Sequence, residues 1–497
     1  MFLSQILDGL EVNTQSYSDF NVESIESDSR LVKNNSIFVA IDGITNKGID
    51  FVDAAIKNGA RAIVIEDKYD LTLATKGIVV IKCTNTRDIL VSLLKKFYGN
   101  IFPQHLLGIT GTQGKTSVVE FIRQILDRLG YNCASIGTLG MKYQDKTDKT
   151  SSLTMMEIVD LYKKLNFLKV KQNIDFVALE ITSQGLDTRR FDGLKVDVAG
   201  VTNICNHEHL DYHKNMENYF SCKMKLFENH CKDHATVVLN PDTEYYDRIR
   251  KICIDKNYRI LTFGYSEDAD FKILSNEIND GFQEFSFRFL TKEYKVKTRL
   301  FGDFQVLNLL EALVFVYSLN LKVSLEDIVD TLGYVSAADG RMKFVAKTKT
   351  EGYVYIDYAH TPTSYETVLG IIKKHLTKLG NGKLISLFGL GGDRDKSKRP
   401  IMGRIAQQYS DVTIVTDDNP RTENAKTIRD EVIAGCDKND ANLYNFDGGR
   451  EEAIKFALSL MQKDDILILL GKGHENYQII GKVKVHFSEE EVVLGNV

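Results

Sequence analysis

The chain has 497 residues, a formal net charge of −5, and 43% hydrophobic and 26% charged residues. This composition is typical of a soluble globular protein that is too long for one core, so we expect three domains of roughly 100 to 200 residues each. The acidic balance excludes a general basic surface, and no apolar run approaches the roughly 18 residues of a membrane span. We therefore expect neither nucleic acid nor a membrane as a partner.

The cysteines point to a reducing compartment. There are seven of them, an odd number, scattered without a C-x-x-C pair, which argues against a disulfide framework or a zinc site. The first residues, MFLSQILDGLEVN, lack the basic start of a signal peptide and carry Asp8 and Glu11 early. A cytoplasmic monomer is expected.

Three α/β segments follow one another along the chain. Residues 1–100 alternate helical stretches with strands predicted at 37–41, 62–65 and 78–81. Residues 101–335 hold predicted strands at 106–110, 176–180, 198–202 and 236–240, with helices between them. Residues 336–497 restart the pattern, with strands predicted at 353–357, 384–389, 412–416 and 466–470. Alternation of strands and helices predicts largely parallel sheets.

The most informative segment is GITGTQGKTS, from Gly108 to Ser117, which lies between an apolar strand and an amphipathic helix. Its glycines let backbone N–H groups converge on phosphate oxygens, while Lys115 supplies a charge and Thr116 a Mg²⁺ ligand. Ile109 stands where the general P-loop pattern has its first glycine. A chance glycine-rich turn is the alternative, but the preceding strand and following helix favour ATP or GTP binding and leave the use of the nucleotide open.

In the last segment every predicted strand runs into a polar cluster. These clusters are 357–360, 391–395, 418–421 and 471–475. One such cluster alone is usually a solvated turn. Parallel sheets bind ligands at the carboxyl ends of their strands, so four clusters on one edge, with Arg394, Arg421, Lys472, Asp357 and Glu475 presented together, indicate a ligand site.

Metal-binding residue types follow two strands of the middle segment. Glu180 ends a strand that reads as buried, and His209 belongs to the run from Thr202 to His213. A carboxylate and an imidazole beside a phosphate loop could complete Mg²⁺ coordination, although histidine is an uncommon ligand for so hard a cation. Taken alone, His209, Asn203, Asp211 and His213 have the ordinary interpretation of core or surface residues.

These segments occur in one order that resembles the Mur ligases. GTQGKTS, Glu180, the run 202–213, Gly340-Arg341 and the four C-terminal clusters carry the resemblance. It extends to Asp28-Ser-Arg30 and residues 37–43, and so covers nearly the whole chain. The fold that it implies is α/β with three domains: an N-terminal UDP-substrate-binding domain at 1–100, a central P-loop ATPase-like parallel-sheet domain at 101–335 and a C-terminal amino-acid-binding Rossmann-like domain at 336–497.

The resemblance implies an ATP-dependent amide ligase that works with Mg²⁺ through an acyl phosphate. In peptidoglycan precursor synthesis, this branch of the family adds an amino acid to UDP-N-acetylmuramoyl-L-alanyl-D-glutamate. Arg421 in the Asp-Asn-Pro-Arg motif matches the arginine that binds the second carboxylate of meso-diaminopimelate, a group that lysine lacks. A guanidinium suits bidentate carboxylate binding, so we expect meso-diaminopimelate as substrate and rejection of L-lysine.

Site residues are carried over by position in this sequence. For ATP they are Gly111, Thr112, Gln113, Gly114, Lys115, Thr116, Ser117, Asn308, Arg341, Asp357 and His360. For catalysis they are Lys115, Glu180, His209 and Lys223, and for the metal Thr116, Glu180, His209 and a carbamylated Lys223. For the UDP-linked substrate they are Ser29, Arg30, Thr154, Ser183 and Arg190, and for the amino acid Arg394, Asp418, Asn419, Pro420, Arg421, Gly471 and Glu475. The residue pattern alone would make Lys223 an ordinary helix lysine.

Two other interpretations stay open. The chain departs from the family pattern mainly on the acceptor side, at 152–156, Gln184, Thr188 and Glu208. A divergent paralogue that joins L-lysine or another amino acid to a different carboxylate fits these departures. A nucleotide-dependent switch would need the phosphate loop but not the clusters at 391–395, 418–421 and 471–475.

Overall fold

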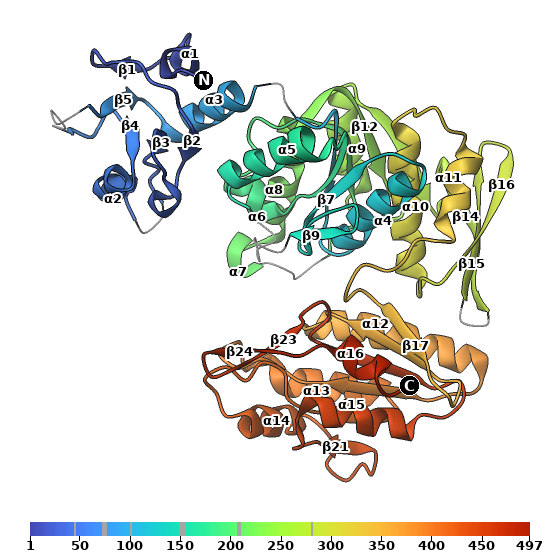
Figure 1. Cartoon of the computed structure of the whole chain (residues 1–497). Helices are drawn as coiled ribbons and strands as arrows, with labels where there is room; N and C mark the ends of the chain where they lie inside the picture. Colours follow the sequence, from blue (N-terminus) through green and yellow to red (C-terminus); the bar gives the residue numbers. More distant parts are fainter. Residues whose placement is uncertain (44–45, 72–76, 100–101, 149–155, 206–209, 280–281) are drawn as a thin grey trace.

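The computed structural model describes residues 1–497 apart from 44–45, 72–76, 100–101, 149–155, 206–209 and 280–281. Three sheets with their helices follow one another from the N-terminus to the C-terminus (Figure 1). Among the helices of these described residues, none is long and apolar enough to cross a membrane.

The N-terminal sheet has the strand order β1-β5-β4-β3-β2. Its strands are β1 (Asn13–Thr14), β2 (Ser24–Glu26), β3 (Ser36–Val39), β4 (Ala60–Glu66) and β5 (Val79–Cys83), parallel except for β1. The helices are α1 (Leu3–Leu7), η1 (Ser29–Leu31), η2 (Gly48–Phe51), α2 (Val52–Lys57) and α3 (Thr86–Tyr98). The strands expected at 37–41, 62–65 and 78–81 are β3, β4 and β5, with ends shifted by a few residues.

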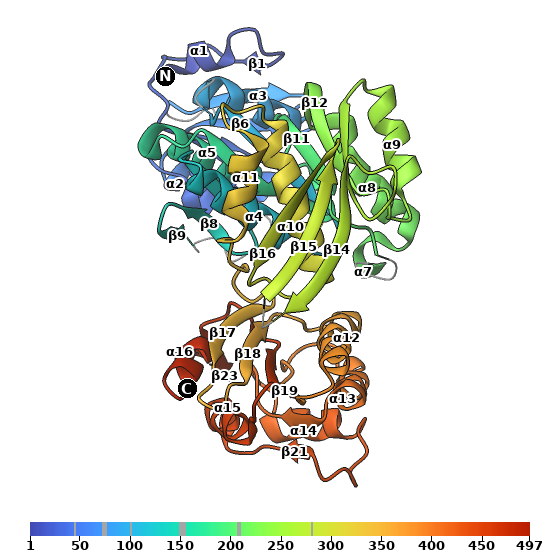
Figure 2. The same ribbon diagram turned by 90° about the vertical axis from the view of Figure 1, so that its right-hand side faces the viewer.

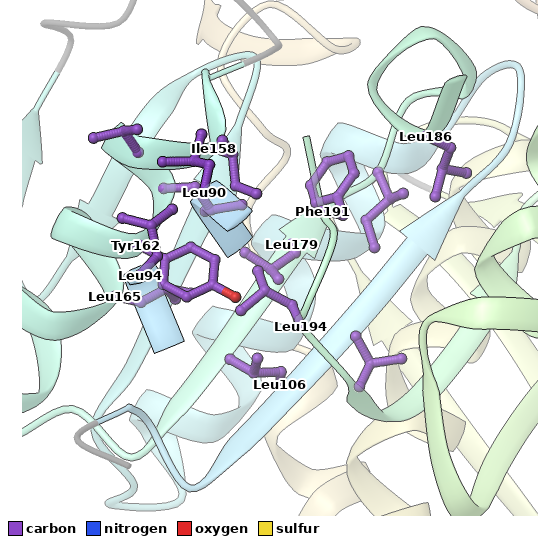
Figure 3. Close-up of a cluster of buried hydrophobic side chains, with 14 of the residues drawn as sticks. Leu90, Leu94, Leu106, Ile158, Tyr162, Leu165, Leu179, Leu186, Phe191 and Leu194 are labelled. Carbon is purple, nitrogen blue, oxygen red and sulfur yellow. The ribbon is translucent and has the colours of Figure 1, made fainter. Parts of the chain in front are cut away.

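Helix α3 joins the first sheet to the second. The side chain of Asn85 caps it by accepting hydrogen bonds from the N–H groups of Arg87 and Asp88. Leu90 and Leu94 of α3 share a buried cluster with Tyr162 of the central part (Figure 3). The hydrophobic core is therefore continuous across the first two sheets.

The central sheet has the order β16-β15-β14-β13-β12-β11-β6-β10-β7-β8-β9. Its strands are β6 (His105–Thr110), β7 (Cys133–Gly137), β8 (Gly140–Tyr143), β9 (Lys146–Asp148), β10 (Phe176–Glu180), β11 (Val196–Val201), β12 (Cys231–Leu239), β13 (Arg259–Gly264), β14 (Phe271–Asn279), β15 (Phe282–Phe289) and β16 (Lys292–Thr298). The middle is parallel as predicted, whereas β14–β16 and β7–β9 are antiparallel. These edges were not predicted from the sequence: β16 is rich in lysine and mostly exposed, and β8 and β9 have only four and three residues.

Helices cover both faces of this sheet. They are α4 (Lys115–Arg128), α5 (Ile158–Gln172), α6 (Ser183–Asp187), α7 (Leu210–His213), α8 (Met216–Asn229), α9 (Tyr246–Asp255), α10 (Asp303–Ser318) and α11 (Leu325–Leu332). Side chains of β6 point alternately to the two faces of the sheet. Leu106 packs with α5 and α8 on one face, and Leu107 and Ile109 pack with α4 and α10 on the other. Because β6 lies between β11 and β10, the loop that follows it emerges at the middle of the sheet.

The C-terminal sheet has the order β17-β18-β22-β19-β20-β21. Its strands are β17 (Lys343–Lys347), β18 (Tyr353–Asp357), β19 (Leu384–Phe388), β20 (Val412–Val415), β21 (Leu443–Asn445) and β22 (Ile466–Leu470), all parallel except β17. Helices α12 (Pro362–Leu379), α13 (Lys398–Tyr409) and α14 (Ala425–Ile433) cover one face, and α15 (Gly449–Leu460) and α16 (Glu489–Leu494) the other (Figure 2). A hairpin of β23 (Tyr477–Ile480) and β24 (Val483–His486) follows β22.

Candidate active site between the central and C-terminal sheets

The loop between β6 and α4 requires glycine at two positions. Gly111 has φ +147°, and a Cβ there would lie 2.0 Å from Thr202 Oγ1. Gly114 has φ +86°, and a Cβ there would lie 2.6 Å from Asn308 Oδ1. Any larger residue would be strained and would also clash, so the loop backbone is free to approach a ligand closely at the N-terminus of α4.

The end of β11 holds this loop in place. Asn203 accepts a hydrogen bond from Thr112 N at its backbone oxygen (2.9 Å) and from Gln113 N at Oδ1 (3.0 Å). Asn203 Nδ2 and Thr202 Oγ1 both donate to the carbonyl of Gln113. These residues, which the sequence suggested only as ordinary polar positions, therefore fix the loop that was predicted to bind phosphate.

Two lysines converge on one carbonyl oxygen of the loop. Lys115 Nζ donates to Gly111 O at 2.9 Å and to Thr112 O at 2.8 Å. Lys223, on α8 and only 1% exposed, donates to the same Gly111 oxygen at 2.6 Å. Two ammonium groups so close together favour an anion in the space beside them.

Glu180 is buried at the end of β10 and gathers hydroxyl groups around its carboxylate. Its Oε2 accepts hydrogen bonds from Thr116 Oγ1 (3.2 Å), Thr138 N (2.9 Å) and Thr138 Oγ1 (3.0 Å). The contact of Thr138 with Glu180 had no sequence signal, because β7 and β10 are brought together only by sheet pairing. Hydroxyl and carboxylate oxygens beside a phosphate loop are the donors that Mg²⁺ prefers, so these residues fit that ion.

Two predicted residues, His209 and Thr154, lie outside the described residues. Within the described part of the chain, no group of three or more His, Cys, Asp and Glu side chains gathers as a metal site. The proposed metal set is therefore represented in the structure by Thr116, Glu180 and Lys223.

The C-terminal sheet supplies the opposite wall of the site. Asp357, at the end of β18, accepts hydrogen bonds from Met342 N and Ala359 N, both at 2.7 Å. Burial raises the pKa of Asp357 above its ordinary value, although the Arg341 guanidinium opposes this shift. The guanidinium carbon of Arg341 lies 5.3 Å from the ring centre of Tyr358, and His360 Nδ1 lies 2.8 Å from Tyr358 O.

A cavity of about 490 Å³ opens between the two walls. Its lining includes residues 111–117, Glu180, Lys223, Asn308, Arg341, Asp357 and His360. All residues predicted to bind ATP thus meet in one space, although they come from two sheets and from segments some 200 residues apart. The volume lies within the range of small-molecule sites, about 300 to 1,000 Å³. Thr138 and Tyr358 also line it and were not predicted.

The residues predicted for the amino acid form a second cluster that does not line this cavity. Asn419 Nδ2 donates to Glu475 Oε2 at 2.9 Å, and Arg421 Nη1 donates to Gly392 O at 2.7 Å. A Cβ on Gly391 would lie 2.7 Å from Arg421 Nη1 and 3.8 Å from Arg394 Cγ, so both arginines flank this loop. Asp418, Pro420 and Gly471 belong to the same cluster, because a Cβ on Gly471 would lie 3.5 Å from Asp418 Oδ2 and a Cβ on Gly392 would lie 1.9 Å from Pro420 O.

The sequence interpretation was wrong about the exposure of Lys472. It was expected to be presented at the sheet edge, but the side chain is fully buried and directed at Asn419 and Glu475. The loop 471–475 packs closely against Gly340, which precedes Arg341. A Cβ on Gly340 would lie only 2.6 Å from Gly473 Cα. The second cluster therefore adjoins the wall of the cavity through this glycine contact.

The residues predicted for the UDP-linked substrate are dispersed. Ser29 is buried in η1, and Arg30 forms an exposed ion pair with Asp28 at 2.6 Å. Arg190 pairs with Glu157 at 2.9 Å. Ser183 lines the cavity and lies 2.9 Å, at Oγ, from His213 Nε2. Of these described residues only Ser183 reaches the cavity.

The fold and the cavity define a nucleotide-binding α/β protein whose phosphate loop faces a second, C-terminal parallel sheet. Family models agree along the chain: "Mur ligase family, catalytic domain" matches residues 21–98, "Mur ligase middle domain" matches 109–316, and "Mur ligase, glutamate ligase domain" matches 340–473. The chain belongs to the Mur ligase family.

Individual relatives are similar over nearly their whole length. A Rickettsia conorii protein named UDP-N-acetylmuramoyl-L-alanyl-D-glutamate--2,6-diaminopimelate ligase is 36% identical over 96% of each chain. A Clostridium tetani protein of the same name is 35% identical over 99% of this chain and 98% of its own. A solved structure of a ligase with this name has a TM-score of 0.69 and 29% identity, covering 96% of this chain and 94% of the other.

Proposed function

We propose that the protein is an ATP-dependent ligase that adds meso-diaminopimelate to UDP-N-acetylmuramoyl-L-alanyl-D-glutamate in peptidoglycan precursor synthesis. The observation that carries the proposal is the cavity in which the phosphate loop, Glu180 and Lys223 face Arg341, Asp357 and His360. Relatives with that activity in their names are similar over nearly the whole chain. Because the reaction consumes ATP, a cytoplasmic location is part of this proposal.

The first proposed step activates the acceptor carboxylate. One of its oxygens attacks the γ-phosphorus of ATP, the bond to the bridging oxygen breaks, and ADP leaves an acyl phosphate behind. Both reactants are anions, so the step needs positive charge and backbone N–H groups around the phosphate. Lys115 and the loop 111–114 supply these, and Lys115 would exchange its bonds to Gly111 O and Thr112 O for phosphate oxygens.

Mg²⁺ would neutralise phosphate charge when bound. Thr116 and Glu180 would hold the ion. His209, which lies outside the described residues, is proposed to hold it with them. We propose that Lys223 joins them as a carbamate, formed when its uncharged amine adds to CO₂ and releases a proton, which would replace an ammonium by an anionic ligand. The buried place of Lys223 beside the loop supports this assignment.

The second proposed step forms the amide. The amine of the amino acid attacks the acyl carbon, phosphate leaves, and the amine loses a proton. We propose that this amino acid is held by Arg394, Asn419, Arg421 and Glu475. Arg421 would bind its second carboxylate. Ser29, Arg30, Thr154, Ser183 and Arg190 are proposed for the UDP-linked acceptor.

The three domains are proposed to divide near residues 100 and 336. The strands of the three main sheets support this division, since they fall within Asn13–Cys83, His105–Thr298 and Lys343–Leu470. Arg421 and the phosphate loop then belong to different domains, so closure between them is expected before amide formation.

Mass spectrometry of the products tests the proposal. The purified protein is given ATP, Mg²⁺, UDP-N-acetylmuramoyl-L-alanyl-D-glutamate and an equimolar mixture of amino acids. The expected product carries one added diaminopimelate, and ADP forms in equal amount. Equally efficient coupling of L-lysine would refute the amino-acid assignment. Turnover with a different carboxylate, but not with this acceptor, would favour the divergent paralogue that residues such as Gln184 in the cavity lining suggest.

A further inference from the structure

Lys472 is a buried lysine beside the second cluster. It follows β22 in the loop 471–475, and its side chain is 0% exposed. Its Nζ lies 3.3 Å from Asn419 Oδ1 and 3.5 Å from Glu475 Oε2. Removing an ammonium group from water is costly unless nearby groups compensate for its charge and its hydrogen bonds.

Lys472, Asn419 and Glu475 form a closed triangle. Asn419 Nδ2 donates to Glu475 Oε2 at 2.9 Å, and Asn419 Oδ1 accepts from Ile479 N at 2.9 Å as well as from Lys472. The Glu475 side chain is 17% exposed, whereas that of Lys472 is fully buried. A ligand can therefore reach the Glu475 carboxylate, but it cannot reach the Lys472 ammonium group.

A second carboxylate, that of Glu489, interacts electrostatically with Lys472. Glu489 on α16 is buried, and Arg450 on α15 donates to its Oε1 at 2.9 and 2.7 Å. Burial raises the pKa of Glu489, while Arg450 and Lys472 both oppose that shift. Lys472 thus contacts one carboxylate and interacts electrostatically with a second, and the ring centre of Tyr477 lies 5.7 Å from its Nζ.

We propose that Lys472 is a positioning residue that sets the affinity for the incoming amino acid. From its buried position it contacts both Asn419 Oδ1 and Glu475 Oε2 and fixes the orientation of these two side chains, so that the exposed side of the carboxylate receives the ammonium group of the amino acid. This inference rests on the proposed function, because it takes Asn419 and Glu475 as amino-acid contacts.

Lys472→Met tests the inference, because methionine has a similar length but no charge. The Michaelis constants for diaminopimelate and ATP are measured separately, with Lys455→Met on the outer face of α15 as the matched control. We expect the KM for diaminopimelate to rise about tenfold or more, as for the loss of a hydrogen bond to a charged group, and the KM for ATP to stay within about twofold. An unchanged KM for diaminopimelate, or an equal rise in both constants, would overturn the inference.

A double-mutant cycle shows whether Lys472 acts through Glu475. In a Glu475→Gln background, Lys472→Met is expected to change the KM for diaminopimelate by less than about threefold, because the carboxylate that Lys472 orients has been removed. Full additivity of the two effects contradicts the proposal. If Lys472→Met does not fold, Lys472→Leu, which likewise removes both the donor and the charge, carries the same expectations.

Two single variants separate failure of this inference from failure of the proposed function. Glu475→Gln and Arg421→Ala should each raise the KM for diaminopimelate if the amino-acid site is assigned correctly. If neither does, the site assignment fails and the inference fails with it. If both do while Lys472→Met does not, only the inference fails.

Discussion

Asn203→Ala should weaken ATP binding without changing the fold. Its side-chain amide makes two hydrogen bonds with Gln113, at 3.0 and 3.3 Å, whereas its backbone bond to Thr112 N would survive the substitution. Each lost bond costs about 0.5 to 1.5 kcal/mol, so the bound shape of the loop becomes less favourable by about 1 to 3 kcal/mol. This corresponds to a rise in the KM for ATP of about 5- to 150-fold.

The measurement is phosphate release at saturating acceptor and amino acid while ATP is varied. Asn381→Ala serves as a control, since it removes one exposed hydrogen bond to Asp464 in a turn of the C-terminal sheet. A KM for ATP within about twofold of wild type in Asn203→Ala would show that the loop keeps its shape without this amide, and the reasoning would fail.

Two further predictions concern the separate roles of Lys115 and Arg421 and the ion pairs of Asp339. Lys115→Ala should abolish acyl-phosphate formation, while Arg421→Ala should spare it and mainly raise the KM for the amino acid; equal loss of the first half-reaction in both would contradict the assigned roles. Burial opposes the ionisation of Asp339. The nearby ammonium groups of Lys142 and Lys343 have the larger effect and lower the pKa of Asp339 to about 2. Asp339→Asn should therefore lose stability at neutral pH in urea unfolding, and the difference from wild type should shrink as pH falls from about 4 to about 2. A difference that is constant over this range would refute that account.

The strands next to the chemistry were largely predictable from the sequence. Those at 176–180, 353–357 and 466–470 have the predicted limits as β10, β18 and β22, because short apolar runs ended by polar clusters carry their own signal. The phosphate loop was predictable for the same local reason, since its glycines and the flanking strand and helix are adjacent in the chain. The antiparallel edge β14–β16 was not predicted: β14 and β16 are largely exposed or half-exposed, although β15 carries a strand signal in its alternating phenylalanines.

Which of these local motifs share a space depends on the tertiary structure. Asp357 ends one strand of the C-terminal sheet and Glu475 follows another, yet Asp357 lines the cavity with the phosphate loop while Glu475 contacts Asn419 outside it. Thr138 reaches Glu180 because β7 pairs with β10, and the buried Lys472 contacts Asn419, which lies 53 residues away in the chain. Residue type and local spacing thus determined which chemistry the chain can support. Pairing and packing between segments far apart in the sequence decided which groups meet, because those contacts depend on how whole sheets and helices pack.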